Sequence, residues 1–135
     1  MPDFLLDVNV LVAHAILEHV HHDRVIEALQ KRAEVGSTYS VCPIIELGLI
    51  RNVMRIAALR IQEARQLLDN ERINLNLKFV PDDLSADQLP NGIQGYRQTT
   101  DGYLAILARK HGLKLLTIDK NISGSVDLLG SDDTL

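Results

Sequence analysis

The chain has 135 residues, of which 46% are hydrophobic, so it has the size of one domain with a core of its own. Its single cysteine, Cys42, excludes an internal disulfide and fits a reducing compartment. The net charge of −4 argues against broad nonspecific binding to nucleic acid, which needs a basic surface. No apolar run approaches the roughly 18 residues of a membrane span. We therefore expect one cytoplasmic domain over residues 1–135, with no membrane segment.

The first apolar segment, residues 4–6, predicts a short buried strand that stops at Asp7. Periodicity does not decide whether residues 8–15 extend this strand or begin a helix. Asp7 either caps that helix or presents a carboxylate at the end of a strand, with Asn9 close by. Both roles are open at this point.

Four histidines lie between His14 and His22, which raises the question of a zinc site. No cysteine or carboxylate accompanies them at zinc-ligand spacing, so a structural or surface role is favoured. An amphipathic helix follows and is ended by Gly36, with Glu27 and Lys31 paired on its polar face. Its predicted apolar face consists of Val25, Ile26, Leu29 and Ala33.

A second strand is predicted at 38–42, and a helix with Pro43 in its first position runs from there to about Met54. Glu46 falls in the apolar stripe of this helix, and its neighbours one turn on are Leu49 and Ile50. Acids are almost never buried without a partner. Glu46 therefore either pairs with an arginine from elsewhere in the chain or points at a cation at the edge of the sheet.

The middle of the chain is predicted as a further amphipathic helix at 57–70 and a third strand over 75–79, where apolar and polar residues alternate. Proline and glycine interrupt residues 82–98, which we expect to form loop and short helical pieces. Arginines also occur along the predicted helix that begins at Pro43 and the one at 57–70. They form either a solvated face or a surface for a partner or for phosphates. These arginines are Arg51, Arg55, Arg60 and Arg65.

A helix and a strand are predicted over residues 99–119. Thr99 and Thr100 supply hydroxyls that can cap the helix, Asp101 lies in its first turn, and Gly112 is placed to end it. The apolar run 115–118 then predicts an interior strand that stops at Asp119. An edge strand is expected at 126–129, and residues 131–135 are expected to be frayed.

Four acidic side chains follow a strand or open the helix that comes after it. They are Asp7, Glu46, Asp101 and Asp119. We expect them to converge, because helices begin and strands end at the same edge of an α/β sheet, where such proteins place their sites. Any one acid is explained as a cap, but four like charges together destabilise each other unless a cation is present. Hard oxygen ligands suit Mg²⁺ or Mn²⁺, which indicates metal-assisted phosphodiester hydrolysis.

Three segments of the chain resemble the signature blocks of PIN-domain nucleases, and most closely those of VapC-type toxins of bacterial toxin–antitoxin pairs. They are FLLDVNVLVAH, CPIIELGLIRN and TTDGYLAILARKHGLKLLTID, and EHVHHDRVIEAL is also similar to that subgroup. The resemblance implies an α/β, Rossmann-like fold with a parallel sheet of about four to five strands flanked by helices. It also implies an RNA endonuclease that needs Mg²⁺ or Mn²⁺, and a homodimer inhibited by a small antitoxin protein.

The resemblance also implies roles for the acids. Asp7, Glu46 and Asp101 match the three core acids of the family and would hold one Mg²⁺ directly or through its waters. Asp119 matches a fourth acid, which would complete that site or help to hold a second ion. Asn9 matches the polar residue after the first acid. The two other neighbours that could orient ligands or water are Thr100 and Thr117.

Two other classes of function are compatible with acids at a sheet edge. A Mg²⁺-dependent phosphatase of the haloacid dehalogenase type also opens with an aspartate after a strand, but here Asn9 occupies the place of its second aspartate. A non-catalytic module could use the acids to hold a structural ion or a basic partner. Cleavage of RNA without hydrolysis of small phosphate esters would separate a nuclease from both.

Overall fold

The structure is a computed structural model that describes residues 2–119, 122 and 124–129. The elements in chain order are β1 (Phe4–Leu6), α1 (Val8–Ala15), α2 (His22–Glu34), β2 (Tyr39–Val41), α3 (Pro43–Ala57), α4 (Ile61–Asn74), β3 (Lys78–Phe79), the 3₁₀ turns η1 (Ala86–Gln88) and η2 (Tyr96–Gln98), α5 (Thr99–Lys110), β4 (Lys114–Thr117) and β5 (Ser125–Asp127).

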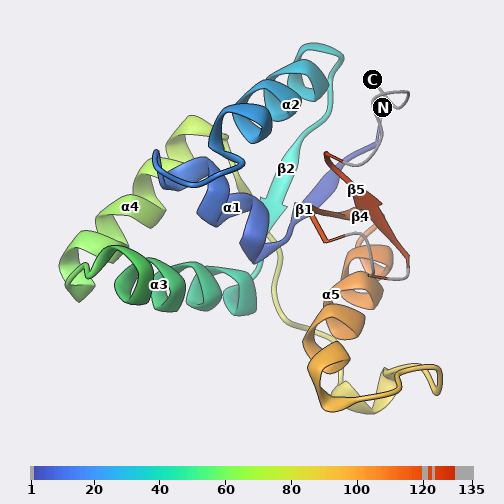
Figure 1. The fold of residues 1–135 in the computed structure, drawn as a ribbon. Helices are drawn as coiled ribbons and strands as arrows, with labels where there is room; N and C mark the ends of the chain where they lie inside the picture. The colour runs from blue at the N-terminus through green and yellow to red at the C-terminus, as the bar shows by residue number, and fades with distance from the viewer. Residues whose placement is uncertain (1, 120–121, 123, 130–135) are drawn as a thin grey trace.

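The strands form one five-stranded parallel sheet with the order β3-β2-β1-β4-β5 (Figure 1). The chain moves outward from β1 to β2 and β3, and then returns to the other side of β1 as β4. The strand order therefore reverses between β1 and β4, and open α/β sheets bind their ligands at such a point, beyond the carboxyl ends of the strands. The predicted α/β fold class is confirmed.

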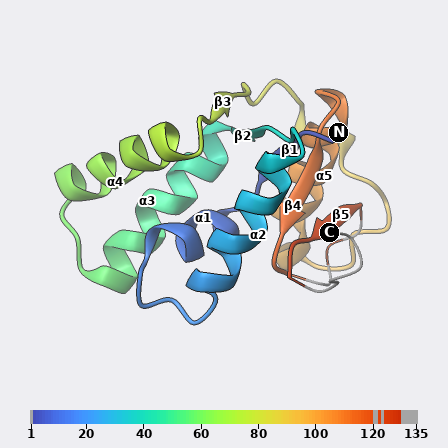
Figure 2. The same ribbon diagram turned by 90° about the horizontal axis from the view of Figure 1, so that it is seen from above.

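Helices α1 to α4 form one group, in which α1 packs against α2 and α3, and α3 packs against α4. Helix α5 lies apart from this group and packs on β4, as the two ribbon views show (Figures 1 and 2). The ends of β1 and β4 lie between the two groups of helices. None of the helices in the described part of the chain is long and apolar enough to cross a membrane.

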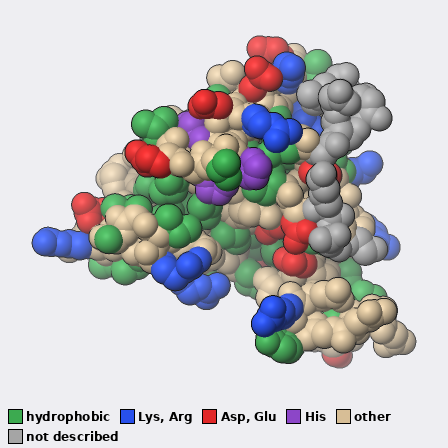
Figure 3. Space-filling view, viewed as in Figure 1, with side chains coloured by type: hydrophobic (Ala, Val, Ile, Leu, Met, Phe, Trp, Pro, Cys, Tyr) green, Lys and Arg blue, Asp and Glu red, His purple; other side chains and the backbone are tan. Residues whose placement is uncertain are grey.

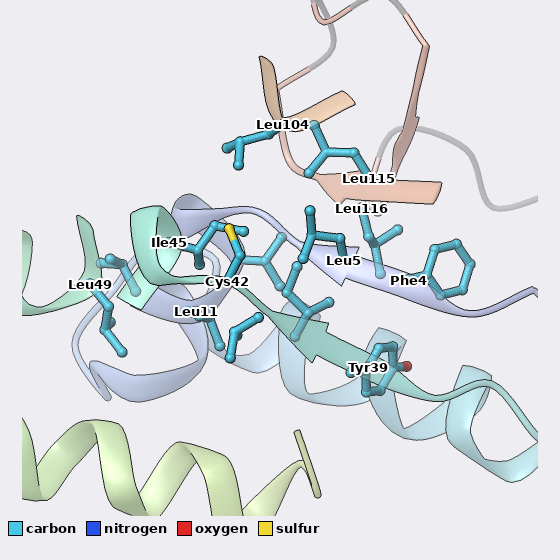
Figure 4. Close-up of a cluster of buried hydrophobic side chains, with 14 of the residues drawn as sticks. Phe4, Leu5, Leu11, Tyr39, Cys42, Ile45, Leu49, Leu104, Leu115 and Leu116 are labelled. Atoms are coloured by element: carbon cyan, nitrogen blue, oxygen red, sulfur yellow. The ribbon is translucent and has the colours of Figure 1, made fainter. Parts of the chain in front are cut away.

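The core forms around the two central strands. Leu5 of β1 and Leu116 of β4 are fully buried, and apolar side chains from α1, α3 and α5 pack around them (Figure 4). Burying one such leucine stabilises the fold by about 1.5–3 kcal/mol. β1, at the centre of the sheet, is buried along its whole length, which is why its sequence reads as a continuous apolar run.

Helix α5 ends as expected and begins differently. Gly112 has a φ of +73°, and Leu113 N–H donates to the carbonyl of Ala108 at 2.8 Å, which closes the last turn. The N-cap residue, however, is Gln98, which makes no capping hydrogen bond with its side chain. The Thr99 hydroxyl instead donates to the carbonyl of Tyr96 at 2.7 Å. The predicted hydroxyl cap is therefore wrong.

The predicted boundaries of the middle helices are also wrong. Helix α3 runs on to Ala57, and Ala58 then takes a left-handed conformation with a φ of 54°. Helix α4 begins at Ile61, where Arg60 N–H donates to the Glu63 carboxylate at 2.8 Å. Apolar spacing continues across this break, so periodicity alone does not locate it.

The third strand is shorter than its alternating pattern predicts, and Phe79 in it is exposed. Leu77 N–H donates to the carbonyl of Arg72 at 3.0 Å, so residues 75–77 close the end of α4 instead of extending the strand. The edge strand is β5, one residue earlier than expected at its start, whereas residues 131–135 lie outside the described residues.

Helix α2 buries Arg32 where the apolar pattern predicted Ala33. The Arg32 guanidinium lies over the Phe4 ring, 5.8 Å from its centroid. The long aliphatic stem of arginine packs against apolar surface in this way while its charge meets an aromatic face. The expected pair on the polar face, Glu27 with Lys31, is present at 3.7 Å.

Candidate active site

Three aspartates meet at the point where the strand order reverses. Asp7 follows β1, Asp119 follows β4, and Asp101 lies in the first turn of α5. Together with side chains from α1, α3 and the α1–α2 connection, they line a hollow of about 340 Å³. Acidic side chains gather at this place on the molecular surface, between the α1 region and the α5 region (Figure 3). We call it the aspartate hollow.

Asp7 performs both of the roles that its sequence position left open. One carboxylate oxygen accepts the Val8 N–H at 2.8 Å at the start of α1, so the residue caps that helix. The other oxygen accepts the Thr117 hydroxyl at 2.8 Å. The side chain is almost fully buried and still lines the aspartate hollow. Its orientation is thus fixed from two elements.

Thr117 and Asn9 connect the ends of the two central strands. The Thr117 hydroxyl accepts the side-chain N–H of Asn9 at 3.0 Å and the backbone N–H of Asp119 at 3.0 Å. The Asn9 carbonyl oxygen accepts the Ile118 N–H at 3.3 Å. Thr117 is fully buried, so this network holds Asp7 and the backbone of Asp119 in place from beneath the hollow.

Burial and neighbouring carboxylates disfavour the ionisation of Asp101 and of Asp7. Burial, followed by the charges of Asp7 and Asp119, raises the pKa of Asp101 to about 6. Burial also raises the pKa of Asp7, with a contribution from the charge of Asp119, although the hydrogen bonds from Thr117 and Val8 oppose the change. A cation between the carboxylates would reverse this electrostatic cost.

The three carboxylates and the amide oxygens of two asparagines in the lining are hard oxygen donors, which suit Mg²⁺ or Mn²⁺ better than zinc. In the described residues, however, no three acidic, histidine or cysteine side chains are already gathered closely enough to enclose an ion. Mg²⁺ usually keeps several waters and is bound through one or two carboxylates. The aspartate hollow therefore suits a partly hydrated ion.

Glu46 is held in an ion pair with an arginine of a neighbouring helix. Its carboxylate pairs with the guanidinium of Arg72 on α4, with Arg72 Nε at 3.1 Å, and Arg72 also lies 3.7 Å from Asp69. Glu46 is not among the described side chains that line the aspartate hollow. Of the two alternatives open from sequence, the structure thus shows the ion pair with an arginine from elsewhere.

Two of the clustered histidines have structural partners. His14 on α1 lies 2.6 Å from the carboxylate of Glu71 on α4, and both side chains are largely buried. His22 donates from Nδ1 to the carbonyl of Ala13 at 2.8 Å, which ties the start of α2 to the end of α1. These contacts agree with the structural role favoured from sequence.

His19 is different, because it lines the aspartate hollow. Its Nδ1 accepts the backbone N–H of His21 at 3.0 Å, so in the neutral ring the proton lies on Nε2. Burial, followed by the neighbouring His21 and His22, lowers its pKa, which favours this neutral form. The position of His19 could not be predicted from the sequence, because the fold of the α1–α2 connection brings it to the hollow and no residue spacing signals it.

Comparisons with known proteins agree with this architecture. The PIN domain family model matches residues 4–124. The chain belongs to the PIN-domain family.

Two relatives from Mycobacterium tuberculosis cover most of the chain. Ribonuclease VapC38 is 39% identical over an alignment of 124 residues that covers 87% of this chain and 86% of the relative. Ribonuclease VapC29 is 37% identical over 120 residues, 88% of this chain and 87% of the relative. A crystal structure of VapBC2 from Rickettsia felis, bound to a DNA fragment from its promoter, matches with a TM-score of 0.66. The structural match covers 92% of this chain and 96% of the matched chain at 18% sequence identity, which shows a shared fold.

Proposed function

We propose that this protein is a metal-dependent endoribonuclease and the toxin of a type II toxin–antitoxin pair. The family membership and the two relatives named as ribonucleases support the reaction class. The observation that carries the proposal is the aspartate hollow itself, where burial and mutual repulsion raise the pKa of Asp101 to about 6. A cluster of carboxylates that lowers the stability of the metal-free protein is typical of a functional site.

Asp7, Asp101 and Asp119 would hold Mg²⁺, or Mn²⁺ in its place. The ion, when bound, supplies an activated water and stabilises the negative charge that develops at the phosphate. Thr117 and Asn9 hold the first carboxylate in one orientation, so little reorganisation is needed for binding. Glu46 would join this site through its Oε1, since Arg72 contacts only its Oε2.

His19 would contribute a hydrogen bond to the substrate. Because its Nδ1 already accepts a backbone N–H, its neutral ring offers Nε2–H as a donor to an oxygen of the RNA in the hollow. A neutral donor positions the substrate and does not deliver a proton. The change His19→Gln, which keeps an N–H donor, should therefore retain more activity than His19→Ala.

The partners proposed for this chain are an RNA substrate, a cognate antitoxin and a second copy of the chain. The name VapBC2 of the solved complex and the toxin-type relatives support an antitoxin. Exposed apolar side chains on α3 and α4, such as Leu47, Ile56 and Ile73, support self-association through these helices. Light scattering of the purified protein would report a mass of two chains if this surface forms a dimer.

The test of the function is cleavage of RNA by purified, partner-free protein in Mg²⁺, in Mn²⁺ and in chelator. We expect cleavage that requires metal and is lost in Asp7→Asn, with Glu46→Gln alongside to decide whether that acid takes part. Hydrolysis of small phosphate esters without cleavage of RNA would favour the phosphatase. Absence of both, with a folded protein, would favour the non-catalytic module.

A further inference from the structure

A second and larger hollow, of about 700 Å³, adjoins the aspartate hollow and shares Asp101 and Asp119 with it. Its floor is the exposed face of α5, where Asp101, Ala105 and Arg109 follow one another at intervals of four residues. At 1.5 Å per residue, this face extends about 12 Å from the acid to the arginine. We call this hollow the α5 groove.

The segment that leads into α5, which is yellow in Figure 1, forms one wall of the groove. Ile93 and Arg97 of this segment line the groove. The segment lies directly on the helix at Gly102, since a Cβ atom built there would come within 2.7 Å of the Ile93 side chain. The absence of a side chain at Gly102 therefore lets the wall approach the floor.

The groove combines aliphatic surface with two positive charges. Ile93, Ala105 and Ile106 provide apolar lining. Arg97 of the wall and Arg109 of the floor are both exposed. Within the part of the chain that the structure describes, neither arginine forms an ion pair. The Arg97 guanidinium instead lies 5.7 Å from the centroid of the Tyr96 ring. Both charges are available to an anion.

From this arrangement we propose that the α5 groove binds single-stranded RNA on one side of the bond that is cut. Arg97 and Arg109 contact backbone phosphates, and the aliphatic lining takes up a ribose or an unpaired base. This proposal rests on the proposed nuclease function. It also explains how a chain with a net charge of −4 draws RNA toward a cluster of acids, since the two positive charges lie beside them.

The experiment measures binding of a fluorescein-labelled, mixed-sequence, single-stranded 12-nucleotide RNA by anisotropy, at several salt concentrations and with Ca²⁺ in place of Mg²⁺. Arg97→Gln and Arg109→Gln should each weaken binding by about threefold to tenfold. Each should also lower the slope of log affinity against log salt by about 0.7, the value for one phosphate contact with a single strand. Arg24→Gln, at an exposed position on α2 and outside both hollows, is the matched control and should bind as the wild type does.

A second variant tests the shape of the groove without changing its charge. Ala105→Leu places a larger side chain on the floor and should weaken binding while leaving the salt slope unchanged. Wild-type affinity in Arg97→Gln and Arg109→Gln, or no RNA binding by the wild type, would overturn the proposal. In the first case the groove is a surface for a protein partner. Failure of the nuclease function is seen separately, as a wild type that binds RNA and does not cut it in Mg²⁺ or Mn²⁺.

Discussion

Asp101 is ionised at an electrostatic cost in the folded protein. Its pKa lies near 6 instead of 3.8, because it is partly buried and faces two further aspartates. A raised pKa means that the folded protein binds the proton more tightly than the unfolded chain does. The stability associated with this group is therefore fully present below pH 3.8 and is lost as the pH rises through about 6.

The first prediction follows from this loss of folding stability with rising pH. Asp101→Asn removes the charge, so it should stabilise the metal-free protein above pH 6 and have little effect near pH 4. A pKa shift from 3.8 to about 6 corresponds to at most about 3 kcal/mol in the free energy of unfolding. Partial exposure of Asp101 reduces the expected gain in stability to roughly 1–2 kcal/mol. Urea unfolding in chelator at pH 4.5 and 7.5 measures it.

The control for that change is Asp23→Asn, because Asp23 occupies the first turn of α2 at the surface and is not among the residues that line either hollow. It should show no gain that grows with pH. If Asp101→Asn were no more stable relative to wild type at pH 7.5 than at pH 4.5, the account of mutual repulsion would be wrong.

At the residue scale, the sequence predicted the acids that follow a strand or open a helix, but not every partner of those acids. Asp7, Asp101 and Asp119 come together because parallel strands end at one edge, which local sequence reveals. The ion pair of Glu46 with Arg72 depends on how α4 lies against α3. The position of His19 depends on the path of a connection between helices. Neither is encoded in local spacing.

At the scale of elements, the contact between α1 and α3 supports the aspartate hollow. Val8, directly after Asp7, packs against Gly48 of α3, where an added Cβ would lie 2.6 Å from a methyl of Val8. Asn52, one turn further along α3, lines the hollow. The close approach of the two helices therefore helps to set the position of Asp7 relative to α3.

The second prediction is that Gly48→Ala destabilises the protein by about 1 kcal/mol, measured by urea unfolding. Alanine favours a helix by about 1 kcal/mol relative to glycine, but overpacking against a stiff valine costs roughly 1–3 kcal/mol. Val8→Ala in the same chain should remove the clash, so the double variant should be more stable than the two separate effects predict.

Gly92→Ala provides the comparison for this substitution, since no described atom outside its two chain neighbours lies within 4 Å of a Cβ built there. It should leave stability within about 0.5 kcal/mol of wild type. Wild-type stability in Gly48→Ala, without any coupling to Val8→Ala, would show that α1 and α3 are free to move apart.

Most elements could be predicted from periodicity, whereas several of their ends could not. Gly112 marks the end of α5 because only glycine readily takes the left-handed conformation found there. Ala58 takes a left-handed conformation without being glycine or asparagine, so the end of α3 carries no such mark. Residues 75–77 alternate like a strand, yet they close a helix because their N–H groups are satisfied by α4.

At the scale of the whole molecule, the reversal of strand order between β1 and β4 brings three aspartates from distant parts of the chain into one hollow. The same arrangement leaves α5 apart from the other helices, with its exposed face along the α5 groove. An acidic centre and a groove lined by arginines are thus products of one topology. The matched PIN-domain segment, residues 4–124, includes both.

The central claim is that the three aspartates form a cation site, and calorimetric titration of the metal-free, partner-free protein with Mn²⁺ at pH 7.5 tests it most directly. We predict saturable binding in the wild type and in Asp23→Asn, and binding at least about tenfold weaker in Asp7→Asn and Asp101→Asn because each removes a charged oxygen ligand. Equal Mn²⁺ affinity in the wild type and both of these variants would contradict the claim.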